Sequence, residues 1–154
     1  MKAVLQRVKY AKVDIDGKTV GEISRGILIL VGVLDGDTDA EVKYLSAKIP
    51  SLRIFEDQNR KMNCSVLDVD GEVLVVPNFT LCANAKKGNR PSYIASAPPD
   101  VANSLFEYFC DKLEENGVKT VERGIFGGDM QVELVNDGPV TLILDTAEIM
   151  PSTK

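Results

Sequence analysis

The residues best suited to chemistry follow the apolar run at residues 73–76, where a buried strand gives way to polar and then basic side chains. An amide, an aromatic ring and a hydroxyl come first, at Asn78, Phe79 and Thr80, and a loop with three cations follows, at Lys86, Lys87 and Arg90. This order predicts a pocket mouth beside an anion-binding site. The alternative is a plain strand end followed by a solvated loop.

The chain contains no histidine, which restricts the catalytic groups available to it. Ser-His-Asp and Cys-His nucleophilic systems are excluded, and so is every metal site that needs an imidazole ligand. Cys64, Cys82 and Cys110 are widely separated and lack Cys-x-x-Cys spacing. They indicate neither a disulfide framework nor a zinc ribbon. We therefore expect reduced, partly buried thiols, no metal and no cofactor.

A second candidate for chemistry is the segment Asn-Asp-Gly-Pro-Val at residues 136–140. Asn, Asp, Gly and Pro each favour a turn for a separate steric reason, so a plain hairpin connector is one interpretation. A Gly-Pro pair also fixes two adjacent carbonyls rigidly, and its peptide bond can be cis at modest cost. Rigid carbonyls can bind an ammonium group, which is the other interpretation.

The formal net charge of −5 argues against broad, non-specific binding of nucleic acid, which depends on neutralising phosphates. A nucleic-acid partner would have to meet a local basic patch. The loop with Lys86, Lys87 and Arg90 is one candidate, and Lys9 with Lys12 is a second.

The pattern predicts more strands than helices. Strands are expected at residues 2–8, 11–15, 18–23, 27–34, 52–56, 64–69, 72–76, 118–122, 130–135 and 140–145, with tight turns at Asp16-Gly17 and Asp70-Gly71. The apolar runs at 27–34 and 73–76 are typical of central strands, and Pro77 should end the second because it lacks a backbone donor.

Two helices are expected. The first spans residues 39–49, because Thr38 and Glu41 form a capping box and Pro50 should end it. The second starts at Pro98-Pro99-Asp100, buries a stripe of Leu and Phe, and closes at Gly117. The fold class is therefore α/β, mixed α+β: a curved, largely antiparallel mixed sheet or flattened β-barrel with two helices packed on it.

The 154 residues suggest one domain, at residues 1–145, and a loosely held tail at 146–154. No apolar stretch reaches the roughly 20 residues that a membrane span needs, and the start is not that of a signal peptide. We expect a cytoplasmic protein without a membrane partner.

Short motifs along residues 1–145 resemble those of the D-aminoacyl-tRNA deacylases. They are QRV at 6–8, GEI at 21–23, RIFED at 53–57, KMN at 61–63, FTL at 79–81, KGNRPSY at 87–93, DMQV at 129–132 and NDGPVT at 136–141. So many matches in the same order are far more specific than any one of them alone.

Pro77 and Asn78 stand where this family usually has serine and glutamine. A proline there resembles a sister branch that removes L-alanine from tRNA, whereas Phe79 and the complete NDGPVT follow the D-specific pattern. The D-specific branch is favoured, and the sister branch is one alternative. The other is a catalytically inert nucleic-acid-binding protein on the same scaffold.

The resemblance implies a hydrolase that cleaves the ester between a D-amino acid, or glycine, and the 3′-terminal adenosine of tRNA. This reaction would proofread mischarged tRNA by chirality. The resemblance also implies a homodimer, in which Gly138 and Pro139 enter the partner's pocket through a cis bond. Their carbonyls would hold the substrate's α-amine and leave no space for an L side chain, and Arg7 would steady this loop.

The pocket implied by the resemblance would be lined by Phe79, Phe126 and Met130, for each of which a position in the core is the alternative. Lys86, Lys87 and Arg90 would face tRNA phosphates. Asn78, Phe79 and Thr80 would be catalytic. Without histidine, backbone N–H groups near Phe79 and Thr80 are the obvious donors to a tetrahedral intermediate. Water would attack, assisted by the terminal 2′-hydroxyl of the tRNA. Thr80 as a covalent nucleophile is the competing hypothesis, disfavoured because no suitable base is adjacent.

Overall fold

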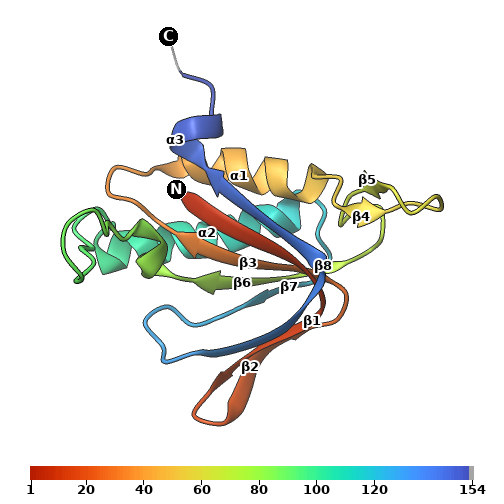
Figure 1. Ribbon diagram of the computed structural model, residues 1–154, viewed down its shortest axis with the longest axis horizontal. Helices are drawn as coiled ribbons and strands as arrows, with labels where there is room; N and C mark the ends of the chain where they lie inside the picture. The colour runs from red at the N-terminus through yellow and green to blue at the C-terminus, as the bar shows by residue number, and fades with distance from the viewer. Residues whose placement is uncertain (153–154) are drawn as a thin grey trace.

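The structure, a computed structural model, describes residues 1–152 (Figure 1). Its strands are β1 (Lys2–Ile15), β2 (Lys18–Ile23), β3 (Gly26–Gly32), β4 (Phe55–Glu56), β5 (Met62–Cys64), β6 (Glu72–Pro77), β7 (Val121–Arg123) and β8 (Gln131–Asp145). Its helices are α1 (Asp39–Ser51), the 3-10 helix η1 (Phe79–Cys82), α2 (Pro99–Glu115) and α3 (Thr146–Ile149). No helix within residues 1–152 is long and apolar enough to cross a membrane.

The main sheet is built around β1, which pairs antiparallel with β2, β3 and β8. On the other side of β3 the pairing is parallel, from β3 to β6 and from β6 to β7. Because one half of β1 pairs with β3 and the other with β2, the sheet curls into a nearly closed barrel (Figure 1). The prediction of a curved, mixed sheet or flattened barrel is confirmed.

The two long helices lie side by side on one face of the sheet (Figure 1). The apolar stripe of α2 is buried at Leu105, Phe106, Phe109 and Leu113, as its helical spacing predicts. Gly117 adopts φ +104° directly after the C-cap of α2, a backbone conformation that favours glycine. The capping box of Thr38 and Glu41 is present at the start of α1. The helix positions are therefore largely predictable from local signals.

The prediction that Pro50 ends the first helix is wrong by two residues, since α1 continues through Pro50 to Ser51. A proline inside a helix lacks the N–H that would bond the carbonyl four residues earlier, which here belongs to Ser46. That carbonyl instead accepts a hydrogen bond from the Asn116 side-chain amide at 3.1 Å. Asn116, at the end of α2, thus compensates for the missing donor.

The hairpin predicted around Asp70-Gly71 is also wrong. β5 pairs with the short β4, and residues 65–71 form a turn instead of a strand. Ser65 and Asp68 close this turn: the Ser65 N–H donates to Asp68 Oδ2 at 2.8 Å, and the Asp68 N–H donates to Ser65 Oγ at 3.2 Å. The turn delivers the chain into β6, which pairs parallel with β3.

The strands expected at 130–135 and 140–145 are one continuous strand, β8, which runs through the Asn-Asp-Gly-Pro segment. Its pairing with β1 is irregular there, with register shifts between Gln6 and Val8 and between Val8 and Ala11. The Asn136 side-chain amide keeps the strand continuous, because it donates to the carbonyls of Arg7 and Val140. The strands expected at 52–56 and 118–122 are shorter or shifted, as β4 and β7.

The expected tail at 146–154 begins with α3, and Thr146 is buried against Met1, whose carbonyl accepts from the Thr146 N–H at 3.0 Å. Thr153 and Lys154, the last two residues of that tail, lie outside the described residues. The division of the chain at residue 145 stays a prediction.

Candidate active site

The strand β6 delivers the polar residues to the surface. Val73 to Val76 are buried between β3 and β7, and Pro77 is the last residue of the strand, as predicted. Because Pro77 has no N–H, the next ladder donor is Asn78, whose N–H bonds the Val31 carbonyl at 2.8 Å. The chain then turns into η1, which exposes Phe79 and Thr80.

Two backbone donors are free at the start of η1. The N–H groups of Phe79 and Thr80 have no hydrogen-bond acceptor within residues 1–152. The first N–H groups of a helical turn have no partner inside the helix, so a substrate oxygen can occupy them. Two adjacent N–H donors can stabilise the oxyanion of a tetrahedral intermediate.

The hydroxyl of Thr80 is not activated as a nucleophile in this structure. Thr80 Oγ1 donates to the side-chain oxygen of Asn78, and an amide oxygen is too weak a base to remove its proton. The two buried thiols are no better suited as nucleophiles, because burial raises the pKa of Cys82, and that of Cys110 to about 12. Free thiols at Cys64, Cys82 and Cys110 agree with the prediction from their spacing.

An apolar pocket of about 560 Å³ opens beside these donors. Its walls come from the end of β3, from Asn78 and Phe79, from the start of α2 at Pro98 to Ala102, and from Phe126. The Phe79 ring packs edge-on against Tyr93, with 5.1 Å between ring centroids. The pocket is large enough for a flat heterocycle and its sugar.

A second pocket of about 490 Å³ lies on the other side of Asn78 and Phe79, towards the inside of the curled sheet. Met130 and Leu134 line it, together with Gln6 and Leu28. The structure therefore places Phe126 in the first pocket and Met130 in the second. Phe79 separates the two, so a substrate held at the Phe79 and Thr80 N–H groups can reach both.

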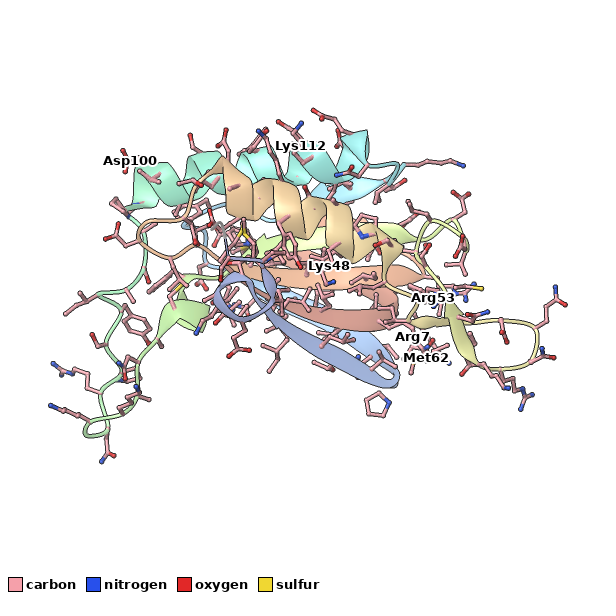
Figure 2. The ribbon with its side chains drawn as sticks, turned by 90° about the horizontal axis from the view of Figure 1, so that it is seen from above. Arg7, Lys48, Arg53, Met62, Asp100 and Lys112 are labelled. Atoms are coloured by element: carbon pink, nitrogen blue, oxygen red, sulfur yellow. The ribbon has the colours of Figure 1, made fainter. Side chains whose placement is uncertain are left out.

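The three predicted cations lie on a projecting loop after η1 (the green segment in Figure 2). A two-way backbone bridge between Asn84 and Ser92 closes the base of this loop, at 2.8 Å in each direction. The side chains of Lys86, Lys87 and Arg90 are exposed, and none has a carboxylate within 4.0 Å among residues 1–152. They are free to meet an anionic partner.

Arg7 holds the Gly138-Pro139 loop. Its side chain is 6% exposed, and Nε donates to the Asp137 carbonyl at 3.0 Å while Nη1 donates to the Ile54 carbonyl at 2.7 Å. The Gly138-Pro139 peptide bond is cis, and both residues are exposed. The Asn136 amide fixes the same segment from the other side. The loop is thus a rigid, protruding element.

The structure does not bring this loop to the pockets of its own chain. Figure 2 shows the green basic loop at one end of the molecule and Arg7 in the other half, close to Arg53 and Met62. The cavity next to Arg7 and Asp137 is a separate one of about 110 Å³. The predicted site residues therefore form two groups that a single chain keeps apart.

The sequence interpretation missed several residues that shape the site. Pro98, Pro99 and Ala102 line the apolar pocket, whereas the sequence pattern at Pro98 and Pro99 indicates only the start of a helix. The Ile54 carbonyl accepts a hydrogen bond from Arg7, and the Asn136 side-chain amide donates to the Arg7 carbonyl, so both residues fix the Arg7 and Gly138 region. Their place in the family motifs could have indicated a role for these two residues, because Ile54 lies in RIFED and Asn136 begins NDGPVT.

Comparison with known proteins gives a consistent result. The sequence model of the family described as "D-Tyr-tRNA(Tyr) deacylase" matches residues 4–145. A D-aminoacyl-tRNA deacylase of Thermosipho africanus is 54% identical over 149 residues, which cover 97% of this chain and 99% of the relative. A D-aminoacyl-tRNA deacylase of Geobacter sulfurreducens is 53% identical over 153 residues, 99% of this chain and 100% of the relative.

Solved structures share the fold. The structure titled "c-Myc DNA Unwinding Element Binding Protein" superposes with a TM-score of 0.89 at 39% identity, over 94% of this chain and 98% of that one. A probable eukaryotic D-amino acid tRNA deacylase superposes with a TM-score of 0.79 at 19% identity, over 93% and 97% of the two chains. The second likeness concerns the fold alone.

Proposed function

This chain belongs to the D-Tyr-tRNA(Tyr) deacylase family, and from that membership we propose that it hydrolyses the ester joining a D-amino acid, or glycine, to the 3′-terminal adenosine of tRNA. The comparisons do not support the two alternatives that the sequence left open, an L-alanyl-specific branch and an inert nucleic-acid-binding protein. Cleaving such esters in the cytoplasm would return a mischarged tRNA to the free pool.

The observation that best supports this proposal is the pair of free N–H groups at Phe79 and Thr80, beside an apolar pocket. In the proposed reaction, water attacks the ester carbonyl, whose oxygen becomes an oxyanion bound by the two N–H groups. The bond from the carbonyl carbon to the ribose oxygen then breaks. The attacking water loses one proton to the departing ribose oxygen, and the neighbouring 2′-hydroxyl relays that proton.

The second group of site residues fits this reaction only if a second copy of the chain supplies it. We propose a homodimer in which Gly138 and Pro139 of one subunit enter the pocket of the other and accept hydrogen bonds from the substrate's α-ammonium. Exposed apolar side chains on β8, at Val132, Val135 and Ile143, offer a surface for such pairing. Rigid carbonyls close to the α-carbon would leave space for hydrogen or a D side chain only.

The direct test of the function is the hydrolysis of D-tyrosyl-, L-tyrosyl-, glycyl- and L-alanyl-tRNA by sub-stoichiometric purified protein. We expect turnover of the D-tyrosyl and glycyl esters, with the L-tyrosyl ester untouched. Preferential hydrolysis of the L-alanyl ester would assign the chain to the other branch. Absence of turnover for all four would refute the proposed activity.

Thr80→Ala should slow the reaction without abolishing it. Because Thr80 contributes its N–H, which alanine keeps, we expect kcat to fall by less than about tenfold, well below the 10²–10³ loss typical of a removed oxyanion donor. Single-turnover rates with D-tyrosyl-tRNA measure this effect. Thr80→Ser is the matched control, because a nucleophilic hydroxyl would make serine active and alanine inactive. An acyl adduct on Thr80 detected by mass spectrometry would overturn the water mechanism.

Replacing Lys86, Lys87 and Arg90 together by alanine should weaken tRNA binding and make it less dependent on salt. Each lost phosphate contact flattens the slope of log K against log[salt] by about 0.7 to 0.9, so we expect a total change of about 2 to 3. Titrations of tRNA between low and moderate KCl measure the slope. The matched control replaces Lys18, Lys43 and Lys119, three exposed lysines elsewhere, and should leave it unchanged. Equal slopes for both triple variants would show that the loop does not contact tRNA phosphates.

A further inference from the structure

The rim of the apolar pocket carries an exposed apolar turn that the proposed chemistry does not use. Residues Tyr93 to Ser96 form this turn, closed by a hydrogen bond from the Ser96 N–H to the Tyr93 carbonyl at 3.0 Å. Ile94 lies at its tip and is 92% exposed, the highest value among the exposed large apolar side chains. Tyr93, next to it, is 40% exposed and lines the pocket.

The turn is held rigidly, so the exposure of Ile94 does not come from a loose loop. The Asp35 N–H donates to the Ala95 carbonyl at 2.9 Å, and the Ala97 N–H donates to the Val33 carbonyl at 3.0 Å. These bonds attach the turn to the segment directly after β3, where Val33 also lines the pocket. Ser96 Oγ reaches the Phe79 carbonyl at 3.5 Å. The position of the turn relative to the candidate oxyanion donors, the N–H groups of Phe79 and Thr80, is therefore fixed.

We propose that Tyr93 and Ile94 form a platform for the base of the nucleotide that precedes the terminal adenosine of the substrate. This inference rests on the proposed function, which places the adenosine in the apolar pocket. Tyr93 lines that pocket, and the Cα of Ile94 is only about 3.8 Å further along the chain. A nucleotide joined to the adenosine must leave the pocket past its rim, where an exposed apolar surface can cover one face of its base.

The charges around the turn favour a nucleotide over another protein surface. Residues 83–97 carry three basic and no acidic side chains, in a chain whose net charge is −5. Proteins that bind single-stranded nucleic acid combine such a cationic path for the phosphates with apolar or aromatic side chains for the bases. Here the path is Lys86, Lys87 and Arg90, on the loop whose base ends one residue before Tyr93.

The test uses three non-hydrolysable analogues in which an amide replaces the ester. The first is D-tyrosyl-adenosine, the second carries a cytidylate on its 5′ side, and the third carries the same ribose phosphate without a base. Because the second and third analogues differ only in the base, comparing their affinities gives the contribution of the base apart from that of the phosphate. By calorimetry we expect the wild-type protein to bind the cytidylate analogue about tenfold more tightly than the abasic one, as for a base packed on a protein surface.

Ile94→Ser should remove most of this tenfold preference, and Ile94→Leu should keep it. Leu67→Ser is the matched control, because Leu67 is another exposed apolar side chain in a turn remote from the pocket, and should also keep it. Equal affinity of the wild-type protein for all three analogues would overturn the platform while leaving the proposed function intact. So would an Ile94→Ser variant that retains the preference and instead weakens subunit association in sedimentation. A wild-type protein that binds no analogue and cleaves no ester would refute the proposed function itself.

Discussion

Gly138→Ala should lower kcat/KM for D-tyrosyl-tRNA by about 100-fold, the loss expected when a substrate-positioning group moves by about 1 Å. Gly138 has φ +138°, a conformation that residues with a side chain rarely adopt. A Cβ atom there would lie 2.8 Å from Val140 Cγ2, 2.9 Å from the Val140 nitrogen and 3.3 Å from Arg7 Nη2. The second contact is with backbone, so the loop itself must shift and its carbonyls must turn. Steady-state rates and circular dichroism together separate this effect from unfolding.

The matched control for Gly138→Ala is Gly36→Ala. Gly36 also has positive φ, +91°, but a Cβ there would meet nothing within 4 Å. Backbone strain is then similar while the proposed substrate loop is untouched, so we expect a small loss of stability and unchanged kcat/KM. If both variants keep wild-type activity, Gly138 does not position the substrate.

A mixing experiment tests whether the loop acts on the partner's pocket. One chain carries Gly138→Ala and keeps its pocket, and the other carries Ala102→Phe, which fills the apolar pocket, and keeps its loop. Co-refolding should restore activity in mixed dimers, because one of the two sites then has an intact pocket and an intact loop. Two chains that each use their own loop would show no recovery.

The sequence was most informative where a local steric rule decides the structure. The Thr38 and Glu41 capping box, the end of β6 at Pro77 and the glycine that closes α2 all depend on a few adjacent residues. For the same reason the residue types of the Asn-Asp-Gly-Pro segment were enough to predict an irregular, rigid backbone there, without knowledge of the residues that contact it. The family resemblance then assigned a role to these positions that composition alone could not.

The sequence was least informative where partners are distant in the chain. Asp70-Gly71 signalled a tight turn correctly, but local signals do not say which strand precedes it, and Ser65 and Asp68 close a non-strand turn there. The parallel pairing of β6 with β3 and β7 depends on contacts across the whole domain. The apolar pocket is equally non-local, because it combines the end of β3, the start of α2 and Phe126.

The separation of the two groups of site residues could not be predicted from spacing either. Arg7 and Asp137 are 130 positions apart but are hydrogen-bonded, whereas Phe79 and Asp137, much closer in sequence, line separate cavities. The curl of the sheet causes this arrangement, since β8 follows β1 along its full length. In the proposed homodimer a second chain brings the two groups together, and Arg7 would then act on the partner's site through the Asp137 carbonyl.

Arg7→Met should lower the free energy of unfolding by about 2 to 4 kcal/mol, because it leaves buried carbonyls without their charged donor. The guanidinium is the donor to both the Ile54 and Asp137 carbonyls, and methionine keeps the bulk of the side chain but neither hydrogen bond. Asp137 Oδ2, at 3.6 Å from Nε, is partly exposed and contributes less. Chemical denaturation measures the loss of stability.

The loss of activity in Arg7→Met should exceed the loss explained by unfolding. At a temperature where the variant is still folded, we expect kcat/KM for the D ester to fall by at least about 100-fold, because the Asp137 carbonyl directly precedes Gly138 and would no longer be fixed. Lys2→Met is the matched control, since Lys2 also lies on β1 but forms only a partly exposed ion pair with Asp145, which contributes little. An Arg7→Met protein that is folded and fully active would show that the loop orders itself without Arg7, and that the hydrogen bonds of Asn136 suffice to fix it.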